Sequence, residues 1–307
     1  MLIVDGHLDL AMNAVHWNRD LTRPLEAIRR REAAFTDKSD RGRGVVALPE
    51  MRRGGVGLCL ATQIGHSVAE QNPIPGWHSP EIAWAQTQAQ RAWYEAMCEA
   101  GEMVQIRTRG DLDRHVDLWK AASPEERARL TVGFVLHLEG ADSLLTPAHV
   151  ERAWEYGLRS IGPAHYGPGR YSPGTGESGP LEPRGRELLR QMETLGIALD
   201  LTHLTDEAFD EALERFQGPV WASHHNCRAL VPYQRQLTDD QIRRIAERGG
   251  VIGAAFDAWM LIPGWERGKT TVETTGVALR HVADHIDHVC QLLGTSAHSA
   301  IGSDLDG

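Results

Sequence analysis

Short apolar runs alternate with amphipathic segments along most of this chain of 307 residues. Strands that are buried on both faces of a sheet have continuous apolar sequences, and most of these runs are of that kind. Eight strands alternating with helices predict an α/β fold, a (β/α)8 barrel of the TIM type, with an open doubly wound sheet as the alternative. The predicted strands cover residues 2–10, 55–62, 132–140, 158–165, 196–203, 219–225, 249–256 and 299–304.

Helical periodicity fills most of the spaces between these strands. The clearest helix start is at Ser79 and Pro80, where a serine that can cap the helix precedes a proline in the first turn. An accessory strand is expected at 104–108. The predicted helices cover residues 79–100, 111–122, 123–130, 147–156, 184–195, 205–216, 238–248 and 276–293.

The chain shows no internal repeat and no domain boundary, so insertions after the first two strands are expected to decorate a single domain, residues 1–307. Residues 13–54 are polar and rich in arginine, and they predict a long loop with some helix around 23–34. Residues 166–183 are rich in glycine and proline, which predicts an irregular loop near a site.

Histidine and carboxylate side chains stand at the ends of most predicted strands. Residues two apart in a strand point to the same face, so His7 and Asp9 are expected to project together. The active sites of such barrels lie where the strands end. A lone histidine there is more often a hydrogen-bonded rim residue than a ligand, but six such strand ends together favour a metal site. The residues concerned are His7, Asp9, Glu139, His165, His203, His224, His225, Asp304 and Asp306.

Three histidines and two carboxylates could hold two divalent ions if one carboxylate bridges them. Imidazole and carboxylate ligands favour zinc or a similar ion over calcium. No lysine lies at a strand end, which excludes a carbamylated lysine as the bridge and leaves Glu139 as the carboxylate placed for it. Two ions about 3.5–4 Å apart can share a hydroxide that attacks a carbonyl group. Asp306 could instead be a turn residue, because it precedes a glycine, and Asp200 could bond neighbouring backbone.

Composition narrows the classes of partner. The net charge is -10, which argues against nucleic acid or an anionic membrane. The four cysteines lie far apart without a C-x-x-C pair, so neither a zinc knuckle nor a redox motif is expected. The N-terminus lacks a basic segment followed by a long apolar one, and no stretch approaches about 18 apolar residues, so a cytoplasmic protein is expected.

Five short motifs occur in the order of a known family, namely DGHLDL (5–10), HLEGAD (137–142), DLTHLT (200–205), SHHNCRAL (223–230) and GSDLDG (302–307). Together they resemble the renal or membrane dipeptidase family, a branch of the amidohydrolase superfamily, and they span nearly the whole chain. The resemblance implies a barrel with a binuclear zinc centre, with two Zn²⁺ per chain. It also implies hydrolysis of dipeptides, often with a D-residue at the C-terminal position.

The resemblance implies a set of metal ligands when it is carried over position by position. His224 is chosen over His225 because it directly follows Ser223, as in the family motif. Adjacent residues of a strand also point to opposite faces, so only one of the two histidines can face the metals. The implied ligands are His7 and Asp9 for one ion, His203 and His224 for the other, and Glu139 as the bridge.

Three further residues match family positions around the substrate. His165 matches the histidine near the scissile carbonyl group, where it helps to stabilise the oxyanion. Asp304 matches the aspartate that handles the proton of the attacking hydroxide and then that of the leaving amine. Arg235 matches the arginine that grips the substrate carboxylate. Without the resemblance, Arg235 would be interpreted as a solvated loop residue.

The sequence departs from the family pattern at several places. Leu8 stands where asparagine is usual, and His225 stands where a small residue is common. Trp259 or Met260 occupies a position where relatives have an aromatic or polar residue near the substrate carboxylate, which leaves the substrate preference open. The chain ends at Gly307, directly after the last strand, whereas relatives continue with a helix and a tail. A truncated chain, or a partner chain covering that surface, is therefore expected.

The same metal site also suits other chemistry. The alternative function is hydrolysis of an N-acyl amino acid, a lactone or a phosphoester, and a catalytically inactive metal-binding homologue ranks below it. A TatD-like nuclease is disfavoured, because it would more naturally show His-x-His in the first strand and a basic groove. Relatives are often dimers, so a homodimer is the assembly considered.

Overall fold

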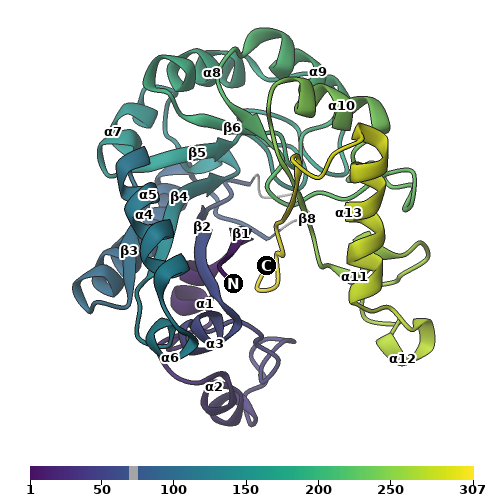
Figure 1. Ribbon diagram of the computed structural model, residues 1–307. Helices are drawn as coiled ribbons and strands as arrows, with labels where there is room; N and C mark the ends of the chain where they lie inside the picture. The colour runs from purple at the N-terminus through teal and green to yellow at the C-terminus, as the bar shows by residue number, and fades with distance from the viewer. Residues whose placement is uncertain (69–74) are drawn as a thin grey trace.

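The computed structural model describes residues 1–68 and 75–307, and its centre is a ring of parallel strands (Figure 1). Hydrogen bonds order the strands β7-β6-β5-β4-β2-β1-β9-β8, and a single bridge between Ala222 and Ile252 joins the two ends of this series. The barrel prediction is therefore confirmed, and the alternative of an open sheet is wrong. The strands of the ring are β1 (Ile3–Leu8), β2 (Val56–Ile64), β4 (Val132–Glu139), β5 (Leu158–Gly162), β6 (Ala198–Asp200), β7 (Val220–Trp221), β8 (Ile252–Ala254) and β9 (Ser299–Ile301).

Several strands are shorter than the apolar runs that predicted them. The run 196–203 contains only β6, and the run 219–225 contains only β7. Beyond these strands the chain leaves the ladder and turns polar side chains toward the mouth of the barrel. His203, for example, has a φ of 68°, which no strand residue adopts. The expected accessory strand is β3 (Met103–Gln105), which pairs with the start of β4.

The helices predicted from periodicity are present, with ends shifted by a few residues. The start of α4 is as expected, because Ser79 Oγ accepts a hydrogen bond from Ile82 N at 3.2 Å. Short helical segments that were not predicted lie in connections: η1 (Ala141–Ser143), α11 (Ala258–Leu261) and α12 (Val272–Thr275). The predicted helices correspond to α4 (Pro80–Glu99), α5 (Arg109–Ala121), α6 (Pro124–Arg127), α7 (His149–Glu155), α8 (Pro183–Leu195), α9 (Asp206–Arg215), α10 (Asp239–Glu247) and α13 (Leu279–Leu293).

The segment after β1 holds more helix than expected. The helix predicted around 23–34 is α2 (Leu25–Glu32), but α1 (Leu10–His16) and α3 (Leu48–Gly54) lie largely in residues predicted as loop. Each of the two unpredicted helices has 7 residues, too few for an amphipathic repeat to show. Such short helices depend on tertiary packing rather than on intrinsic propensity.

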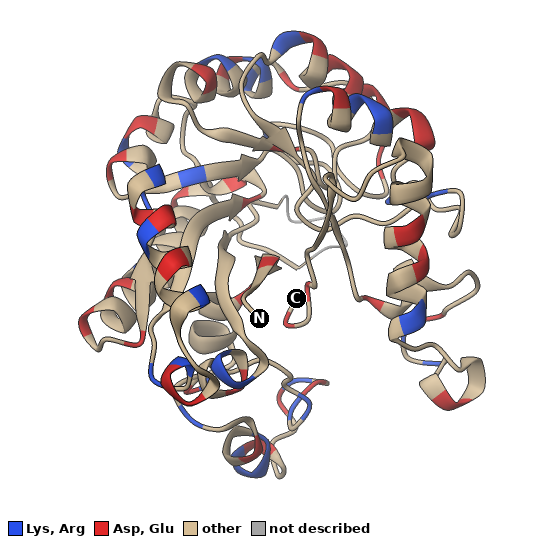
Figure 2. Ribbon diagram, viewed as in Figure 1, with Lys and Arg blue, Asp and Glu red and all other residues tan. Residues whose placement is uncertain are grey.

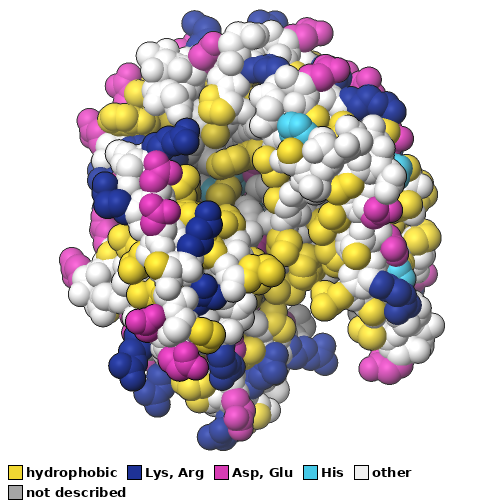
Figure 3. Space-filling model, in the orientation of Figure 1, with side chains coloured by type: hydrophobic (Ala, Val, Ile, Leu, Met, Phe, Trp, Pro, Cys, Tyr) yellow, Lys and Arg dark blue, Asp and Glu magenta, His cyan; other side chains and the backbone are white. Residues whose placement is uncertain are grey.

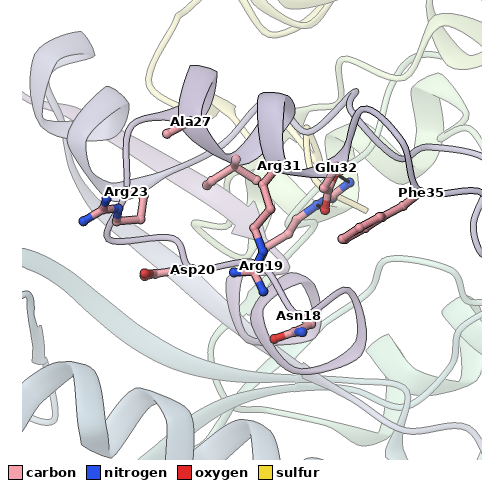
Figure 4. A pocket seen from close by; sticks show the side chains of 9 residues that line it. Asn18, Arg19, Asp20, Arg23, Ala27, Arg31, Glu32 and Phe35 are labelled. Carbon is pink, nitrogen blue, oxygen red and sulfur yellow. Dashed lines mark hydrogen bonds and ion pairs between the residues drawn. The ribbon is translucent and has the colours of Figure 1, made fainter.

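A buried ion pair organises this insertion (Figure 4). Arg19 Nε and Nη2 donate to the two carboxylate oxygens of Glu32 at 2.9 and 3.2 Å. Arg19 Nη1 also donates to Asn13 Oδ1 at 2.5 Å. Asn13 Nδ2 in turn donates to the backbone oxygens of Asp9 and Asp306, at 3.2 and 2.6 Å. The insertion is thereby tied to the carboxyl end of β1 and to the C-terminal residues, which meet at the barrel mouth.

The interior of the barrel is polar and narrow. The Asp5 carboxylate accepts hydrogen bonds from Ser303 N at 2.8 Å and from Ser303 Oγ at 2.5 Å. The carbonyl oxygen of Ser223 lies so close to the neighbouring strands that a Cβ would stand 1.7 Å from it at Gly302 and 2.0 Å from it at Gly253. Glycine is therefore required where the chain after β7 approaches β8 and the end of β9.

The apolar core lies between the strands and the outer helices. Along β4, His137 and Glu139 point into the barrel, while Phe134 and the buried leucines between them point outward. The ring of Phe134 stacks on Tyr94 of α4, with ring centroids 5.0 Å apart. Because both faces of β4 are buried, its sequence could not show the alternation of a half-exposed strand.

The surface shows where the barrel is covered. Charged residues belong mainly to the outer helices (Figure 2). Among the helices described, none is long and apolar enough to cross a bilayer. Strands β1 and β9 are less covered than β2, since Val4 is 44% exposed and the residues of β9 are only partly buried. Hydrophobic side chains gather in the hollow of the face between α13 and these strands (Figure 3).

Candidate metal centre

Five side chains meet at the carboxyl ends of four strands. β1 supplies His7 and is followed by Asp9, β4 ends in Glu139, and His203 and His224 follow β6 and β7. All five are buried, and His7 is 0% exposed. The sequence predicted this gathering, because the carboxyl ends of the strands of a barrel lie at one face.

Glu139 lies between two groups of ligand atoms. Its Oε2 is 3.5 Å from His7 Nε2, which is also 3.6 Å from Asp9 Oδ2. Its Oε1 is 3.2 Å from His203 Nε2 and 3.3 Å from His224 Nε2. One carboxylate therefore offers one oxygen to each group, which is the arrangement that a bridging ligand requires.

The unpaired polar atoms at this place fit a cation. In the part of the chain that the structure describes, the buried atoms His7 Nε2 and Asp9 Oδ1 have no hydrogen-bond partner. His7 Nε2 faces the carboxylates of Asp9, Glu139 and Asp304, the last at 3.9 Å. Buried carboxylates of this density are unfavourable unless positive charge accompanies them. Three overlapping triads of side chains bring their ligand atoms within 4.8 Å of one another: His7, Glu139 and His224; Glu139, His165 and His203; and His7, Asp9 and Asp304.

Two of these residues have backbone conformations that are rare for their type. The φ angles of His203 and Asp304 are 68° and 53°, in the left-handed region that favours glycine. Such positions cluster at functional sites, where the surrounding structure holds them. Here the turn at His203 comes after the end of β6, and the imidazole Nε2 lies 3.2 Å from Glu139 Oε1.

The electrostatic environment separates the carboxylates. Burial alone would raise the pKa of Glu139, but the adjacent imidazoles, His7 foremost, hold it well below its usual range. Burial raises the pKa of Asp304 well above its usual range against the effect of His7, and the carboxylates of Asp9 and Glu139 add to the rise. Two carboxylates with such different proton affinities suit a ligand and a proton carrier respectively.

A cavity of about 320 Å³ opens above these side chains. His165 stands on one wall, with its ring centroid 4.3 Å from that of His66 and 4.5 Å from that of His203. The remaining wall residues include Met12, Ile64, Tyr166, Arg235, Asp257, Met260 and Arg267. The cavity thus places His165 next to the predicted ligands and combines apolar with charged walls.

Arg235 lines this cavity, and two of its side-chain donors have no partner among the described residues. The side chain is buried, and Nη2 donates to the backbone oxygen of His224 at 2.9 Å. Within the described residues, Nε and Nη1 have no partner. A guanidinium with unpaired N–H groups can bind a carboxylate through charge-assisted hydrogen bonds. The interpretation of Arg235 as a solvated loop residue is therefore wrong.

The structure also decides between neighbouring candidates. His224, not His225, faces Glu139, and His225 N instead donates to Gly253 O at 2.7 Å. Asp306 does more than form a turn, because its Oδ1 accepts a hydrogen bond from Asp9 N at 2.9 Å. Met260 lines the cavity at the position where the sequence departs from the family pattern.

Sequence reasoning missed several residues at the site. Thr175 Oγ1 contacts His203 Nδ1 at 2.8 Å, and Ser223 Oγ contacts His224 Nδ1 at 2.9 Å. The loop 166–183 was expected near a site, but nothing in its sequence singled out Thr175. His66 was missed because it follows β2 in a segment without a family motif.

Comparison with known proteins gives a family for this arrangement. The model of the family described as membrane dipeptidase, peptidase family M19, matches residues 1–307. An uncharacterized protein in the pqqA 5′ region of Klebsiella pneumoniae is 32% identical over 198 residues, which are 61% of this chain and 70% of that protein. Among the curated relatives the chain spans from 28% to 70% of their own length.

Two solved structures are similar over the whole chain. A family M19 metallo peptidase, dipeptidase AC, has a TM-score of 0.75 at 27% identity, covering 100% of this chain and 85% of that one. A metallo peptidase from Rhodobacter sphaeroides, solved with a phosphinate mimic of the dipeptide L-Ala-D-Ala, has a TM-score of 0.75 at 26% identity. It covers 100% of this chain and 86% of that one.

Proposed function

Because this chain belongs to the membrane dipeptidase family, peptidase family M19, we propose that it hydrolyses dipeptides with two zinc ions held at the strand ends. The observation that carries the proposal is the position of Glu139, whose two oxygens face two separate groups of ligand atoms. Imidazole and carboxylate donors suit zinc. In this proposal His7 and Asp9 hold one ion, His203 and His224 hold the other, and Glu139 bridges them.

Two divalent ions at this position would activate water and polarise the scissile carbonyl group. His165 Nε2 lies 3.8 Å from Oε1 of Glu139, the proposed bridging ligand, and is therefore close to the proposed metal site. From there His165 would donate a hydrogen bond to the oxygen of the scissile carbonyl group as negative charge develops on that oxygen. Asp304 would accept the proton of the attacking water and deliver it to the leaving amine. A carboxyl group whose pKa is raised by burial holds a transferred proton more readily than an exposed carboxyl group does.

The proposed substrate is a dipeptide with a free C-terminal carboxylate. Arg235 would bind that carboxylate through its guanidinium, whose Nε and Nη1 have no partner in the described chain. The cavity of about 320 Å³ lies at the small end of ligand sites, which suits a dipeptide better than a longer peptide. The relative from Rhodobacter sphaeroides was solved with a mimic of L-Ala-D-Ala, so we propose that substrates with a D-residue at the C-terminal position are included.

The test measures metal content first and hydrolysis second. We expect about two zinc ions per chain, as a two-metal site requires, and cleavage of dipeptides from a panel of L,L and L,D pairs. Chelation should abolish cleavage, and added zinc should restore it. Metal binding without cleavage of any dipeptide would refute the proposed substrate class.

The same panel should include N-acyl amino acids, lactones and phosphoesters, which are the alternative substrates. The free donors of Arg235 favour a substrate that carries a carboxylate next to the scissile bond. Cleavage of lactones or phosphoesters in preference to dipeptides would assign the site to that alternative. A chain that binds no metal would refute both.

A further inference from the structure

The three histidines of the proposed metal site share an unusual feature on the side away from the ligand atoms. Their Nδ1 atoms meet hydroxyl groups, whereas metal-binding histidines commonly meet a carboxylate, a backbone carbonyl or water there. His203 Nδ1 lies 2.8 Å from Thr175 Oγ1. His224 Nδ1 lies 2.9 Å and His7 Nδ1 3.5 Å from the same atom, Ser223 Oγ. One serine therefore contacts imidazoles from both groups of ligand atoms.

A buried carboxylate fixes the direction of the hydrogen bonds at this serine. Thr202 Oγ1 lies 2.7 Å from Asp200 Oδ1, and a carboxylate only accepts, so the threonine proton points to Asp200. Thr202 Oγ1 can then accept the proton of Ser223 Oγ, which lies 3.3 Å away. When Ser223 donates to Thr202, its two lone pairs remain for His224 and His7, which then donate from Nδ1. Their Nε2 atoms are left with the lone pairs that metal binding needs.

The backbone holds Ser223 in place. Its N donates to Asp200 Oδ1 at 2.9 Å. Its carbonyl oxygen occupies the narrow space left by glycines, where a Cβ at Gly302 would come within 1.7 Å. Ser223 is also almost completely buried. The Ser223 backbone is therefore held relative to the neighbouring strands, and its hydroxyl group lies within reach of imidazoles that follow from both β1 and β7.

We propose that Ser223 is a positioning residue that orients histidines of both zinc ions, with Thr202 and Asp200 setting the direction of its hydrogen bonds. The proposal rests on the proposed function, because it takes His7 and His224 as ligands. It predicts that loss of one hydroxyl group weakens two metal sites together. Among the described residues, the Thr175 hydroxyl group contacts one proposed ligand, His203, and so it should affect one site only.

The experiment compares metal binding by metal-free variants, titrated with zinc against a chromophoric chelator. Ser223→Ala should weaken both binding steps: about 10–100-fold for the His224 group, and less for the His7 group, where the contact is longer. Thr175→Val should weaken one step only. Ser160→Ala is the matched control, since its buried hydroxyl contacts His137, which is not a proposed ligand, and both steps should stay unchanged.

A second pair of variants covers the case in which Ser223→Ala does not fold. Thr202→Val leaves Ser223 present but removes its acceptor, so both steps should weaken, and Thr202→Ser should restore them. Wild-type affinity at both steps in Ser223→Ala, or in Thr202→Val, would overturn the proposal, and so would weakening of one step alone. A wild-type chain that binds fewer than two ions would refute the proposed function itself, which keeps the two failures distinct.

Discussion

Replacement of Arg235 by methionine should remove the hydrogen bonds to the substrate carboxylate while leaving the proposed metal ligands in place. The guanidinium is 4% exposed, and Nε and Nη1 are its donors without a partner among the described residues. A hydrogen bond to a charged group contributes about 1.5–3 kcal/mol, so two of them contribute about 3–6 kcal/mol. At about 1.4 kcal/mol per tenfold change, kcat/KM for a dipeptide should fall by about 10²–10⁴.

The assay compares a dipeptide with its C-terminal amide, which lacks the charge that Arg235 would bind. The wild-type enzyme should have a much lower kcat/KM for the amide than for the dipeptide. Arg235→Met should therefore lower kcat/KM for the amide by less than about tenfold. Arg235→Lys keeps the positive charge but lacks the planar guanidinium. Its kcat/KM for the dipeptide should lie between that of the wild type and that of Arg235→Met. Equal losses on both substrates would refute the reasoning, because they would mean that Arg235 acts through its bond to His224 O. Zinc content must be measured in each variant for the same reason.

Stability gives a second check on the same residue. Burial lowers the pKa of Arg235, so the charged guanidinium reduces the stability of the protein without substrate. Methionine fills a similar volume without a charge or unpaired donors, and the melting temperature of Arg235→Met should therefore rise. A lower melting temperature would indicate that the guanidinium is satisfied before any substrate binds.

Three further predictions concern other parts of the structure. Asp304→Asn should keep its zinc and lose about 10²–10⁴ in kcat, the usual size of a general acid–base contribution, and near wild-type turnover would exclude the role of proton carrier. Burial raises the pKa of Asp142 to about 6, so its contribution to stability is lost as the pH rises from about 4 to about 6. In urea unfolding, the free energy of unfolding of Asp142→Asn relative to wild type should therefore rise by about 1 kcal/mol between pH 5 and pH 7.5. A difference that stays constant over this range would contradict this prediction. Glu32→Ala should destabilise the chain by about 1.5–3 kcal/mol, because the buried Arg19 loses the carboxylate that accepts from its Nε and keeps only its ion pair with Asp40, whereas the exposed Glu26→Ala on the same helix should cost less than about 0.5 kcal/mol.

The sequence predicted the barrel because most of its strands are buried on both faces. Continuous apolar runs such as 132–140 mark such strands, and their number and alternation with helices are enough for the architecture. The ends of the strands were harder to predict. Hydropathy does not show that the chain turns at His203, because its φ of 68° is set by the barrel around it. The helices α1 and α3 were not predicted for a similar reason, because each is short and depends on tertiary contacts.

The part of the candidate site that lies at the carboxyl ends of the strands could be predicted from the sequence. Parallel strands bring their carboxyl ends together, so His7, Glu139 and His203 could be expected to meet without knowledge of distances. The hydroxyl groups behind them could not be expected in this way. Ser223 was used only to choose His224, and its contact with His7 joins residues 216 positions apart. Such contacts depend on the register and the close approach of strands, which no local pattern encodes.

The polar interior and the apolar exterior of the barrel separate function from stability. Outward-facing residues such as Phe134 and Leu138 belong to the core shared with the outer helices, where removal of a buried side chain costs about 2–5 kcal/mol. A neutral hydrogen bond inside the barrel contributes only about 0.5–1.5 kcal/mol. Loss of the Ser223 hydroxyl should therefore leave a folded barrel with altered metal binding. The glycines that admit the Ser223 backbone are a different case, because any side chain at Gly302 would have to displace that backbone. Substitutions there should unfold the mouth of the barrel and the metal site together.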